Sequence, residues 1–278
     1  MNIGIVGLGL IGGSLAKSVK ARTLHTVLGA DRDKETMMLA RLCGAIDAPL
    51  SEDNVSECDI IFAALRPAAA AEWTKANAER IKKGSILVDM CGVKRAVCGK
   101  IAPIAREHGF MYIGGHPMAG KERGGFVNSD GSLFVGASMI LTPDERTDMH
   151  MLEILKPLFL DIGFANLTFS TPDEHDRMIA YTSQLAHVIS SSYVKSPEAL
   201  AHRGYSAGSF NDMTRVARLD EDMWTELFLD NADNLSEQLE IFIKNLSDFK
   251  TAIDAGDDET LKKLLKEGKE RKAMAGGC

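Results

Sequence analysis

The sequence has few cysteines, no long hydrophobic run and no excess of positive charge. Its five cysteines stand at positions 43, 58, 91, 98 and 278 without paired CxxC spacing, which argues against a disulfide framework and against a zinc site. A reducing cytoplasm is therefore the expected location. No stretch reaches the length that spans a bilayer, and no basic segment followed by a cleavable apolar one begins the chain. We expect a soluble protein that makes no membrane contact.

The charge balance is mildly acidic, with 32 Lys and Arg against 39 Asp and Glu and a formal net charge of -7. Nucleic acids and anionic membranes are bound by clustered Lys and Arg, so neither is expected as a partner. The 278 residues are enough for a substantial core and for two domains. We place these domains at residues 1–170 and 171–278.

The chain opens with a strand, a glycine-rich turn and a helix. Residues 2–6 form a β-branched run, and the turn reads Gly-Leu-Gly-Leu-Ile-Gly. In such a turn the first glycine allows the tight bend, the second lets a pyrophosphate approach the backbone, and the third lets the helix pack closely on the strand. The residues expected to contact a dinucleotide here are Gly7, Leu8, Gly9, Leu10, Ile11 and Gly12.

A second expected strand, residues 26–30, ends at Asp31. A carboxylate at this position accepts hydrogen bonds from the adenosine ribose hydroxyls and repels a 2′-phosphate. The sequence therefore favours NAD as the cofactor over NADP. Arg32, the next residue, keeps NADP as the less favoured alternative.

Further buried-strand runs at 59–65 and 85–89, with helix-forming sequence between them, predict a parallel sheet covered by helices on both faces. Ligands of such sheets lie at the carboxyl ends of the strands. The loop at Leu65 and Arg66 is expected either to contact the cofactor or to be a plain turn. Lys94 and Arg95, after the next strand, either meet an anionic substrate or begin a solvated helix. Strands at 137–143 and 165–170, with a helix at 147–160 between them, complete this half.

His116 lies in a glycine-bracketed run, Gly-Gly-His-Pro-Met-Ala-Gly, that we expect to be a loop. Imidazole is the side chain whose ordinary pKa lies near neutrality, so it can take a hydroxyl proton while hydride leaves the same carbon. His116 is therefore the candidate catalytic base. The alternative is a histidine that caps a loop.

The second half loses its β-branched runs and is expected to be helical. On a helix through residues 175–187, Asp176 and His187 are eleven residues apart, close to three turns, and share a face with Ser183. This polar stripe predicts a lined cavity, and the alternative is a buried histidine satisfied by a neighbour. Arg215 is a candidate clamp for a substrate carboxylate, because guanidinium offers two parallel hydrogen bonds. A surface ion pair is equally compatible with its position.

A regular hydrophobic spacing of alternately four and three residues predicts one long helix with a heptad-like seam. A seam of this length exceeds what one small helical domain buries alone, so we expect part of it to pack across a two-fold axis in a homodimer. Packing within one chain is the competing interpretation. The seam consists of Phe228, Ala232, Leu235, Leu239, Phe242, Leu246, Phe249 and Ile253, and a further helix is expected at 257–272.

Taken in order, these motifs resemble the prephenate/arogenate dehydrogenase family. The resemblance runs from Asn2 to about Ile253, and its more specific parts are residues 115–122, the pair His175-Asp176, residues 183–187 and residues 212–224. It implies an α/β N-terminal Rossmann-like domain and an all-α C-terminal dimerisation domain. It also implies NAD(P)-dependent oxidative decarboxylation of prephenate or arogenate on the route to tyrosine.

The resemblance also implies residue roles. It makes His116 the partner of the substrate's ring hydroxyl and Arg215 the binder of a substrate carboxylate. Glu122, His187 and Trp224 would line the pocket, together with the Asp176 and Ser183 expected above.

Two positions depart from the family pattern. Gly92 stands where the family often has a serine, in the loop after the strand that ends at Asp89, and Gln184 stands where it often has a histidine. The group that orients His116 and the shape of the side-chain subsite therefore stay open, as does the choice between prephenate and arogenate.

Three other functions remain open. β-Hydroxyacid dehydrogenases and pyrroline-carboxylate reductases also join an N-terminal nucleotide-binding fold to a helical dimer domain. Their chemistry usually centres on a lysine or on helical-domain hydroxyls rather than on a His-Pro loop. The third function, from a different class, is a non-catalytic NAD-sensing protein that dimerises through the long helix.

Overall fold

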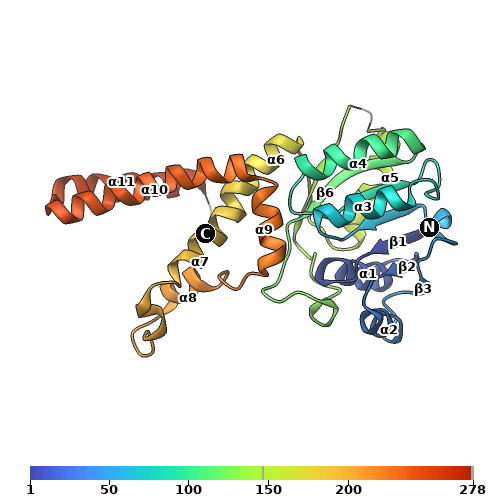
Figure 1. Cartoon of the computed structure of the whole chain (residues 1–278), viewed down its shortest axis with the longest axis horizontal. Coiled ribbons are helices and arrows are strands. Elements are labelled where there is room, and N and C mark those ends of the chain that lie inside the picture. The colour runs from blue at the N-terminus through green and yellow to red at the C-terminus, as the bar shows by residue number, and fades with distance from the viewer. Residues whose placement is uncertain (146, 277–278) are drawn as a thin grey trace. The chain divides into compact units, whose positions relative to one another are not determined.

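The computed structural model describes residues 1–145 and 147–276, and its N-terminal part is an eight-stranded sheet with the strand order β3-β2-β1-β4-β5-β6-β7-β8 (Figure 1). Neighbouring strands are parallel except at β6 and β7, which pair antiparallel. The predicted parallel sheet is therefore confirmed, with one antiparallel pairing that the sequence did not indicate. The strands are β1 (Asn2–Val6), β2 (Thr26–Ala30), β3 (Ala48–Pro49), β4 (Ile60–Ala63), β5 (Ile86–Asp89), β6 (Met111–Pro117), β7 (Ser138–Thr142) and β8 (Asn166–Phe169).

Helices cover both faces of the sheet, as the alternating sequence predicted. Successive residues of a strand point to opposite faces, so Phe62 of β4 joins one apolar cluster and Ile61 joins the other. The helices on the Phe62 side include α1 (Leu10–Arg22) and α5 (Met149–Asp161), whereas α3 (Pro67–Asn77) and α4 (Arg95–His108) lie on the Ile61 side. The remaining elements of this half are α2 (Lys34–Leu42) and the 3₁₀ turns η1 (Val55–Glu57) and η2 (Phe126–Asn128).

The second half of the chain is helical. It contains α6 (Pro172–Ile179), the π-helical segment η3 (Ala180–Leu185), α7 (Ala186–Tyr193), η4 (Pro197–Leu200), α8 (Gly208–Thr214), α9 (Glu221–Leu229), α10 (Ala232–Ala255) and α11 (Asp258–Ala275). By contacts, the chain divides into one compact unit at Met1–Asn231 and a second that begins at Ala232. This division by contacts falls later than the predicted boundary at residue 170, which lies between the last strand, β8, and the first helix of the helical half, α6.

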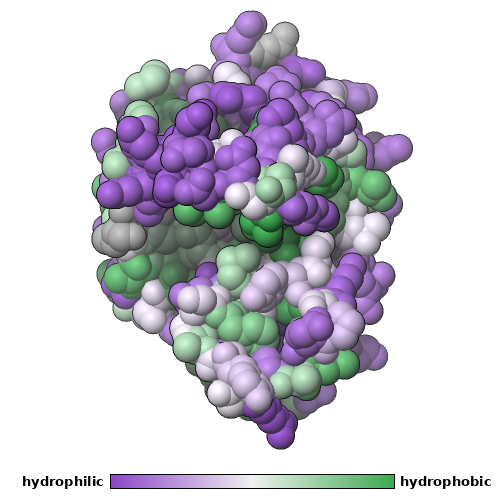
Figure 2. All heavy atoms as spheres, turned by 90° about the vertical axis from the view of Figure 1, so that its left-hand side faces the viewer, coloured by the Kyte–Doolittle hydropathy of each residue, from purple (hydrophilic) through white to green (hydrophobic). Residues whose placement is uncertain are grey.

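The second unit is a helical hairpin in which α10 packs on α11. The predicted seam is divided, because α9 ends at Leu229 and leaves Phe228 outside the long helix. Of the seam residues in α10, Leu235 is buried whereas Leu246 and Ile253 are more than half exposed. Figure 2 shows hydrophobic side chains among hydrophilic ones on this side of the molecule. The hairpin thus leaves part of its apolar seam uncovered within one chain.

Two further observations concern the described residues only. None of their helices combines the length and the apolar character that crossing a bilayer requires. Their four cysteines, at 43, 58, 91 and 98, are free thiols, and Cys278 lies outside the described range.

Candidate active site

The turn between β1 and α1 has the geometry of a dinucleotide-binding loop. Gly7 has a φ of +85°, which only glycine adopts readily. A Cβ on Gly12 would lie 1.8 Å from the Gly7 carbonyl oxygen, whereas a Cβ on Gly9 would meet nothing within 4 Å. Gly12 is thus required for packing and Gly9 faces open space. No side chain caps the first turn of α1 and no acidic residue lies in it, so its N–H groups suit a pyrophosphate.

Asp31 follows β2 at the same edge of the sheet. One of its carboxylate oxygens accepts a hydrogen bond from the Leu8 N–H at 2.7 Å, and the other accepts one from the Asp33 N–H at 2.9 Å. The carboxylate is thus tied to the glycine turn itself. Arg32 is exposed. Asp31 therefore lies where a residue that contacts the adenosine ribose is expected.

The loop at Leu65 and Arg66 is connected to the helical half of the first unit. Glu226 of α9 accepts a hydrogen bond from the Ala68 N–H at 2.7 Å, and its other oxygen lies 4.0 Å from Nε of Arg66. A carboxylate at a helix N-terminus is stabilised by the helix dipole. Glu226 therefore fixes the start of α3, although it lies 158 positions from Ala68 in the sequence.

His116 lies near the end of β6 rather than in a loop, so the predicted loop is wrong. It pairs with Ile140 of β7. The glycines before it are needed for close packing, since a Cβ on Gly114 would lie 2.3 Å from Thr142 Oγ1 and one on Gly115 would lie 2.6 Å from the Asp89 carbonyl. Because β6 is parallel to β5 and continues the parallel order from β1, His116 and the glycine turn lie at the same edge of the sheet.

A second histidine holds the His116 ring. Nδ1 of His116 lies 2.9 Å from Nε2 of His175, and Nδ1 of His175 lies 2.7 Å from Oδ1 of Asp176. The two imidazoles meet edge to face, with centroids 5.1 Å apart. His175 and Asp176 are buried, whereas His116 is partly exposed. The other His116 nitrogen, Nε2, faces Gly92, whose hypothetical Cβ would lie 4.0 Å from it.

Burial and neighbouring charge keep both imidazoles neutral. Burial first, then His175 and Lys94, hold the pKa of His116 well below its ordinary value. Burial also lowers the pKa of His175 against the opposing hydrogen bond to Asp176. Burial disfavours the ionised Asp176, but hydrogen bonds from His175, Arg95 and Lys94 outweigh it and lower the pKa of this carboxyl. At neutral pH the site therefore holds two neutral histidines and one carboxylate.

Lys94 is fully buried and connects the carboxyl ends of β5 and β6. Its Nζ forms an ion pair with Asp89 and donates a hydrogen bond to the Gly115 carbonyl. Tyr112 donates to the other Asp89 oxygen at 2.7 Å. Burial opposes the charge on Lys94, but Asp89 outweighs it and raises the pKa of the ammonium. Lys94 is therefore an internal cation, neither the solvated helix start nor the open anion contact that the sequence left as alternatives.

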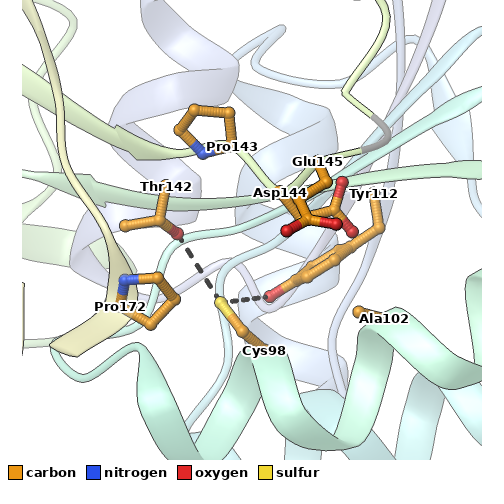
Figure 3. A pocket seen from close by; sticks show the side chains of 8 residues that line it. All are labelled: Cys98, Ala102, Tyr112, Thr142, Pro143, Asp144, Glu145 and Pro172. Atoms are coloured by element: carbon orange, nitrogen blue, oxygen red, sulfur yellow. Dashed lines mark hydrogen bonds between the residues drawn. The ribbon is translucent and has the colours of Figure 1, made fainter.

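The Tyr112 hydroxyl also borders a cavity of about 220 Å³ at the side of the sheet (Figure 3). There Cys98 lies between Tyr112 and Thr142, with its sulfur 3.4 Å and 3.6 Å from their hydroxyl oxygens. Burial raises the pKa of the Cys98 thiol, so it is a poor nucleophile. None of the residues predicted to bind substrate is among the described residues that line this cavity.

Helix α9 connects the His116 environment to the polar residues of the helical half. Leu227 would contact a Cβ on Gly92 at 3.4 Å. One turn earlier, Trp224 packs on the His187 ring with centroids 3.9 Å apart. Nδ1 of His187 lies 3.1 Å from the carbonyl oxygen of Val216, the residue that follows Arg215. Burial lowers the pKa of His187, and the positive charge of Arg215 lowers it further. Arg215 is exposed at the end of α8, so its guanidinium is accessible to a ligand.

Of three further residues predicted to bind substrate, Asp176 lies differently from expectation, whereas the structure leaves the roles of Ser183 and Glu122 as predictions. Asp176 is fully buried, with its oxygens occupied by His175 and by the backbone N–H groups of Lys94 and Arg95, so it supports the site and does not line it. Ser183 is partly exposed on η3. Glu122 is exposed in the segment after β6, and no hydrogen bond or ion pair joins it to the histidine pair within the described range.

The common face of Asp176 and His187 was predicted from regular α-helical spacing, but η3, which lies between them, is π-helical. A π-type turn holds about one residue more than an α-helical turn, so eleven positions do not make three regular turns here. Gln184, within this segment, is joined to Asp176 through Asn231. Its amide donates to the Leu227 carbonyl at 2.9 Å, and Asn231 donates both to its oxygen and to the Asp176 carbonyl, each at 2.8 Å.

His175, Gln184 and Asn231 are the residues that the sequence analysis did not assign to the site. Two of them carried a signal in the sequence: His175 belongs to the His175-Asp176 motif of the resemblance, and Gln184 departs from the family pattern, whereas Asn231 carried none. Gln184 is buried and makes internal hydrogen bonds, so at this position it fixes α9 rather than forming a subsite.

A doubly wound sheet with a glycine turn, a carboxylate after β2 and a neutral histidine at the same edge defines a dinucleotide-dependent oxidoreductase. Residues 15–166 match the family described as "Prephenate dehydrogenase, nucleotide-binding domain", and residues 171–267 match "Prephenate dehydrogenase, dimerization domain". The chain belongs to the prephenate dehydrogenase family.

Individual relatives are similar along the whole chain. The cyclohexadienyl dehydrogenase of Zymomonas mobilis is 32% identical, over 97% of this chain and 94% of its own length. A crystal structure of prephenate dehydrogenase from A. aeolicus in complex with hydroxyphenyl propionate and NAD+ superposes with a TM-score of 0.87 at 29% identity, covering 99% of this chain and 98% of that one. The arogenate dehydrogenase of Synechocystis gives 0.82 at 26% identity, with coverages of 99% and 100%.

Proposed function

We propose that this chain oxidatively decarboxylates prephenate or arogenate with NAD, in the biosynthesis of tyrosine. One observation carries the proposal: a neutral imidazole with an available Nε2 lies at the same sheet edge as an uncapped glycine turn. Membership of the prephenate dehydrogenase family supports it.

In this proposal His116 accepts the proton of the ring C4 hydroxyl at Nε2. Bound NAD supplies the acceptor for the hydride that leaves C4. The carbonyl formed at C4 is joined through the ring double bonds to the carbon that carries the ring carboxylate. As carbon dioxide leaves, the electron pair of its bond moves through the ring to the C4 oxygen, which takes a proton, and the ring becomes aromatic. The chain therefore has to provide a base, an aligned cofactor and a fixed carboxylate.

Arg215 is the residue that we assign to the substrate carboxylate. Its guanidinium can form two parallel hydrogen bonds with a carboxylate, and its charge already acts on His187. Trp224 and His187 provide an aromatic wall next to it. We further propose that Asp31 makes NAD the preferred dinucleotide, because its carboxylate repels a 2′-phosphate.

The test is to incubate the purified chain with NAD and prephenate, then with NAD and arogenate, and to follow the absorbance of reduced nicotinamide. Formation of the band with either substrate, together with release of carbon dioxide, is the expected result. Parallel assays with NADP should give a lower kcat/KM. A chain that binds NAD but reduces it with neither substrate would refute the proposed activity.

We also propose that the chain forms a homodimer through α10. The family domain matched at 171–267 is a dimerization domain, and Leu246 and Ile253 expose apolar surface on this helix. Light scattering should give twice the mass of the 30.2 kDa chain. The double variant Leu246→Asp/Ile253→Asp should be monomeric, whereas Lys262→Asp, an exposed residue of α11, should leave the mass unchanged. A wild-type chain that is monomeric at micromolar concentration would contradict this proposal.

A further inference from the structure

The hydrogen bonds around Asp176 determine where the protons of both histidines lie. Asp176 accepts the backbone N–H of Lys94 at 2.7 Å and that of Arg95 at 2.9 Å, at the start of α4. The helix dipole and these two donors favour a negative charge here. An ionised carboxylate can only accept hydrogen bonds, so the ring nitrogen of His175 that faces Asp176, Nδ1, must carry a proton.

The tautomer of His175 in turn determines the tautomer of His116. A neutral imidazole has one N–H and one lone pair, so His175 Nε2 is the acceptor. The partner at 2.9 Å, His116 Nδ1, must then donate and carries the proton of that ring. His116 Nε2 is left with its lone pair, on the side of the ring that faces Gly92.

We infer that His175 and Asp176 are a positioning pair that holds His116 in the tautomer whose Nε2 accepts the substrate proton, an inference that rests on the proposed function. No proton moves along the chain of hydrogen bonds. When Nε2 gains a proton, Nδ1–H still donates to His175, and the charge of Asp176 opposes the unfavourable effect of Lys94 on the new imidazolium. The other charges that face the pair are Asp89 and Arg95.

Gly92 lies on the other side of the His116 ring from this pair. A glycine after β5 offers His116 no hydrogen-bonding side chain. Its missing Cβ leaves space in front of Nε2, bounded by Leu227. Among the residues that the structure describes, His116 is therefore hydrogen-bonded through Nδ1 alone, and the side of Nε2 stays free for the substrate hydroxyl.

The test compares variants that preserve or remove the direction of the hydrogen bonds. His175→Gln keeps a carbonyl acceptor toward His116 and an amide donor toward Asp176, whereas His175→Leu removes both. Asp176→Asn puts an NH₂ group in place of one carboxylate oxygen. Position 176 can then donate a hydrogen bond to His175, which would reverse the tautomers of both His175 and His116. Exposed residues supply the matched controls His150→Gln and Asp173→Asn, the second on the same helix as Asp176.

The first readout is the ¹⁵N NMR spectrum of histidine-labelled protein without substrate or cofactor, with the His116 signal assigned from its absence in His116→Asn. We expect the Nδ1–H tautomer at His116 in the wild type and in His175→Gln, and a mixture or the opposite tautomer in His175→Leu and Asp176→Asn. A wild-type spectrum dominated by the Nε2–H tautomer would overturn the inference. So would an unchanged spectrum in both His175→Leu and Asp176→Asn.

The second readout is kinetic. His175→Leu should lower kcat by about a hundredfold while KM and the Kd for NAD change by less than about threefold, as expected for loss of a group that orients a base. His175→Gln should recover at least a tenth of the wild-type kcat. If His175→Leu does not fold, Asp176→Asn and His175→Gln provide the same comparison. Unchanged kcat in the folded variants contradicts the inference. A wild-type chain without activity contradicts the proposed function instead, and the NMR spectrum then decides the tautomer of His116.

Discussion

The Lys94 ammonium donates a hydrogen bond over 2.5 Å to the carbonyl of Gly115, the residue immediately before His116. The backbone N–H of the same lysine donates to Asp176, which holds His175. One residue at the start of α4 therefore supports His116 twice, once through its own strand and once through the second histidine.

Lys94→Met should destabilise the protein strongly. Asp89 would be left fully buried without its cation, and breaking a buried pair in this way costs about 3–5 kcal/mol of unfolding free energy. Urea denaturation followed by circular dichroism measures this loss. The control is Lys82→Met, which removes an exposed pair with Asp59 worth about 0–1 kcal/mol. Equal stability of the two variants would refute the structural role of Lys94.

His116→Asn should lower kcat by about two to four orders of magnitude, the usual contribution of a positioned proton acceptor. Cofactor binding should be nearly unchanged, because the glycine turn and Asp31 are separate residues. Fluorescence titration with NADH measures the second quantity, and His150→Asn, an exposed residue of α5, controls for histidine loss in general. Turnover at the wild-type level would remove His116 from the mechanism.

Arg215→Lys should raise the KM for substrate by about tenfold to a hundredfold, because one charge-assisted hydrogen bond is worth about 1.5–3 kcal/mol. The guanidinium fork binds a carboxylate twice and an ammonium cannot reproduce this geometry. Steady-state kinetics with the preferred substrate measures the effect. Arg218→Lys, an exposed neighbour, should change KM by less than twofold. A similar KM for both variants would show that Arg215 is a surface residue.

Two alanine substitutions in the glycine turn should separate folding from cofactor binding. Gly12→Ala places a Cβ 1.8 Å from the Gly7 carbonyl oxygen and should lower both Tm and NAD affinity. Gly9→Ala meets nothing within 4 Å in the protein, so its Tm should stay within about 2 °C while NAD binding weakens. Calorimetric titration with NAD and a thermal scan provide the two measurements. A Gly9→Ala chain with unchanged NAD affinity would contradict the assigned pyrophosphate position.

Stability should fall as the pH drops below about 6.5. The unfolded chain protonates its histidines near that value, whereas the folded pKa values of His116, His175 and His187 are lowered. The unfolded state therefore binds more protons below pH 6.5, and unfolding becomes more favourable until the folded pKa values are passed. Carboxyl groups such as Asp176, whose pKa is also lowered, contribute only below about pH 4.

Thermal scans from pH 8 to 4.5 measure this dependence. His175→Gln should show a shallower fall of Tm between pH 6.5 and 5 than the wild type, because one group with a lowered pKa is removed. His150→Gln, which replaces an exposed histidine, should keep the wild-type slope. Equal slopes of Tm against pH in all three proteins would exclude His175 as a cause of the loss of stability at low pH.

The features that were predictable from sequence are those determined by neighbouring residues. The glycine turn and the strands at 2–6 and 26–30 are confirmed with the expected bounds, because turn geometry and strand burial depend on residues close in the chain. The strand that contains His116 was missed, because its two glycines suggest a turn. Only the contacts with Thr142 and Asp89 show that they are needed for packing.

The support of His116 was not predictable in the same way. His175 is 59 residues away, and the Lys94–Asp176 hydrogen bond joins positions 82 apart. Periodicity says which face of a helix is polar but not which groups of another element will meet it. The identity of the partner could therefore be read only from the folded chain.

The π-type turn at η3 also affects how this helix can be engineered. An α-helix rotates by about 100° per residue, so a designer who counts turns from Asp176 through 180–185 would place a new side chain about a quarter of the circumference from the intended side. Deleting one residue there would restore a regular repeat, and every later position through Tyr193 would then rotate against its neighbours. Mutational libraries aimed at substrate choice should therefore number α7 from its own first residue, Ala186.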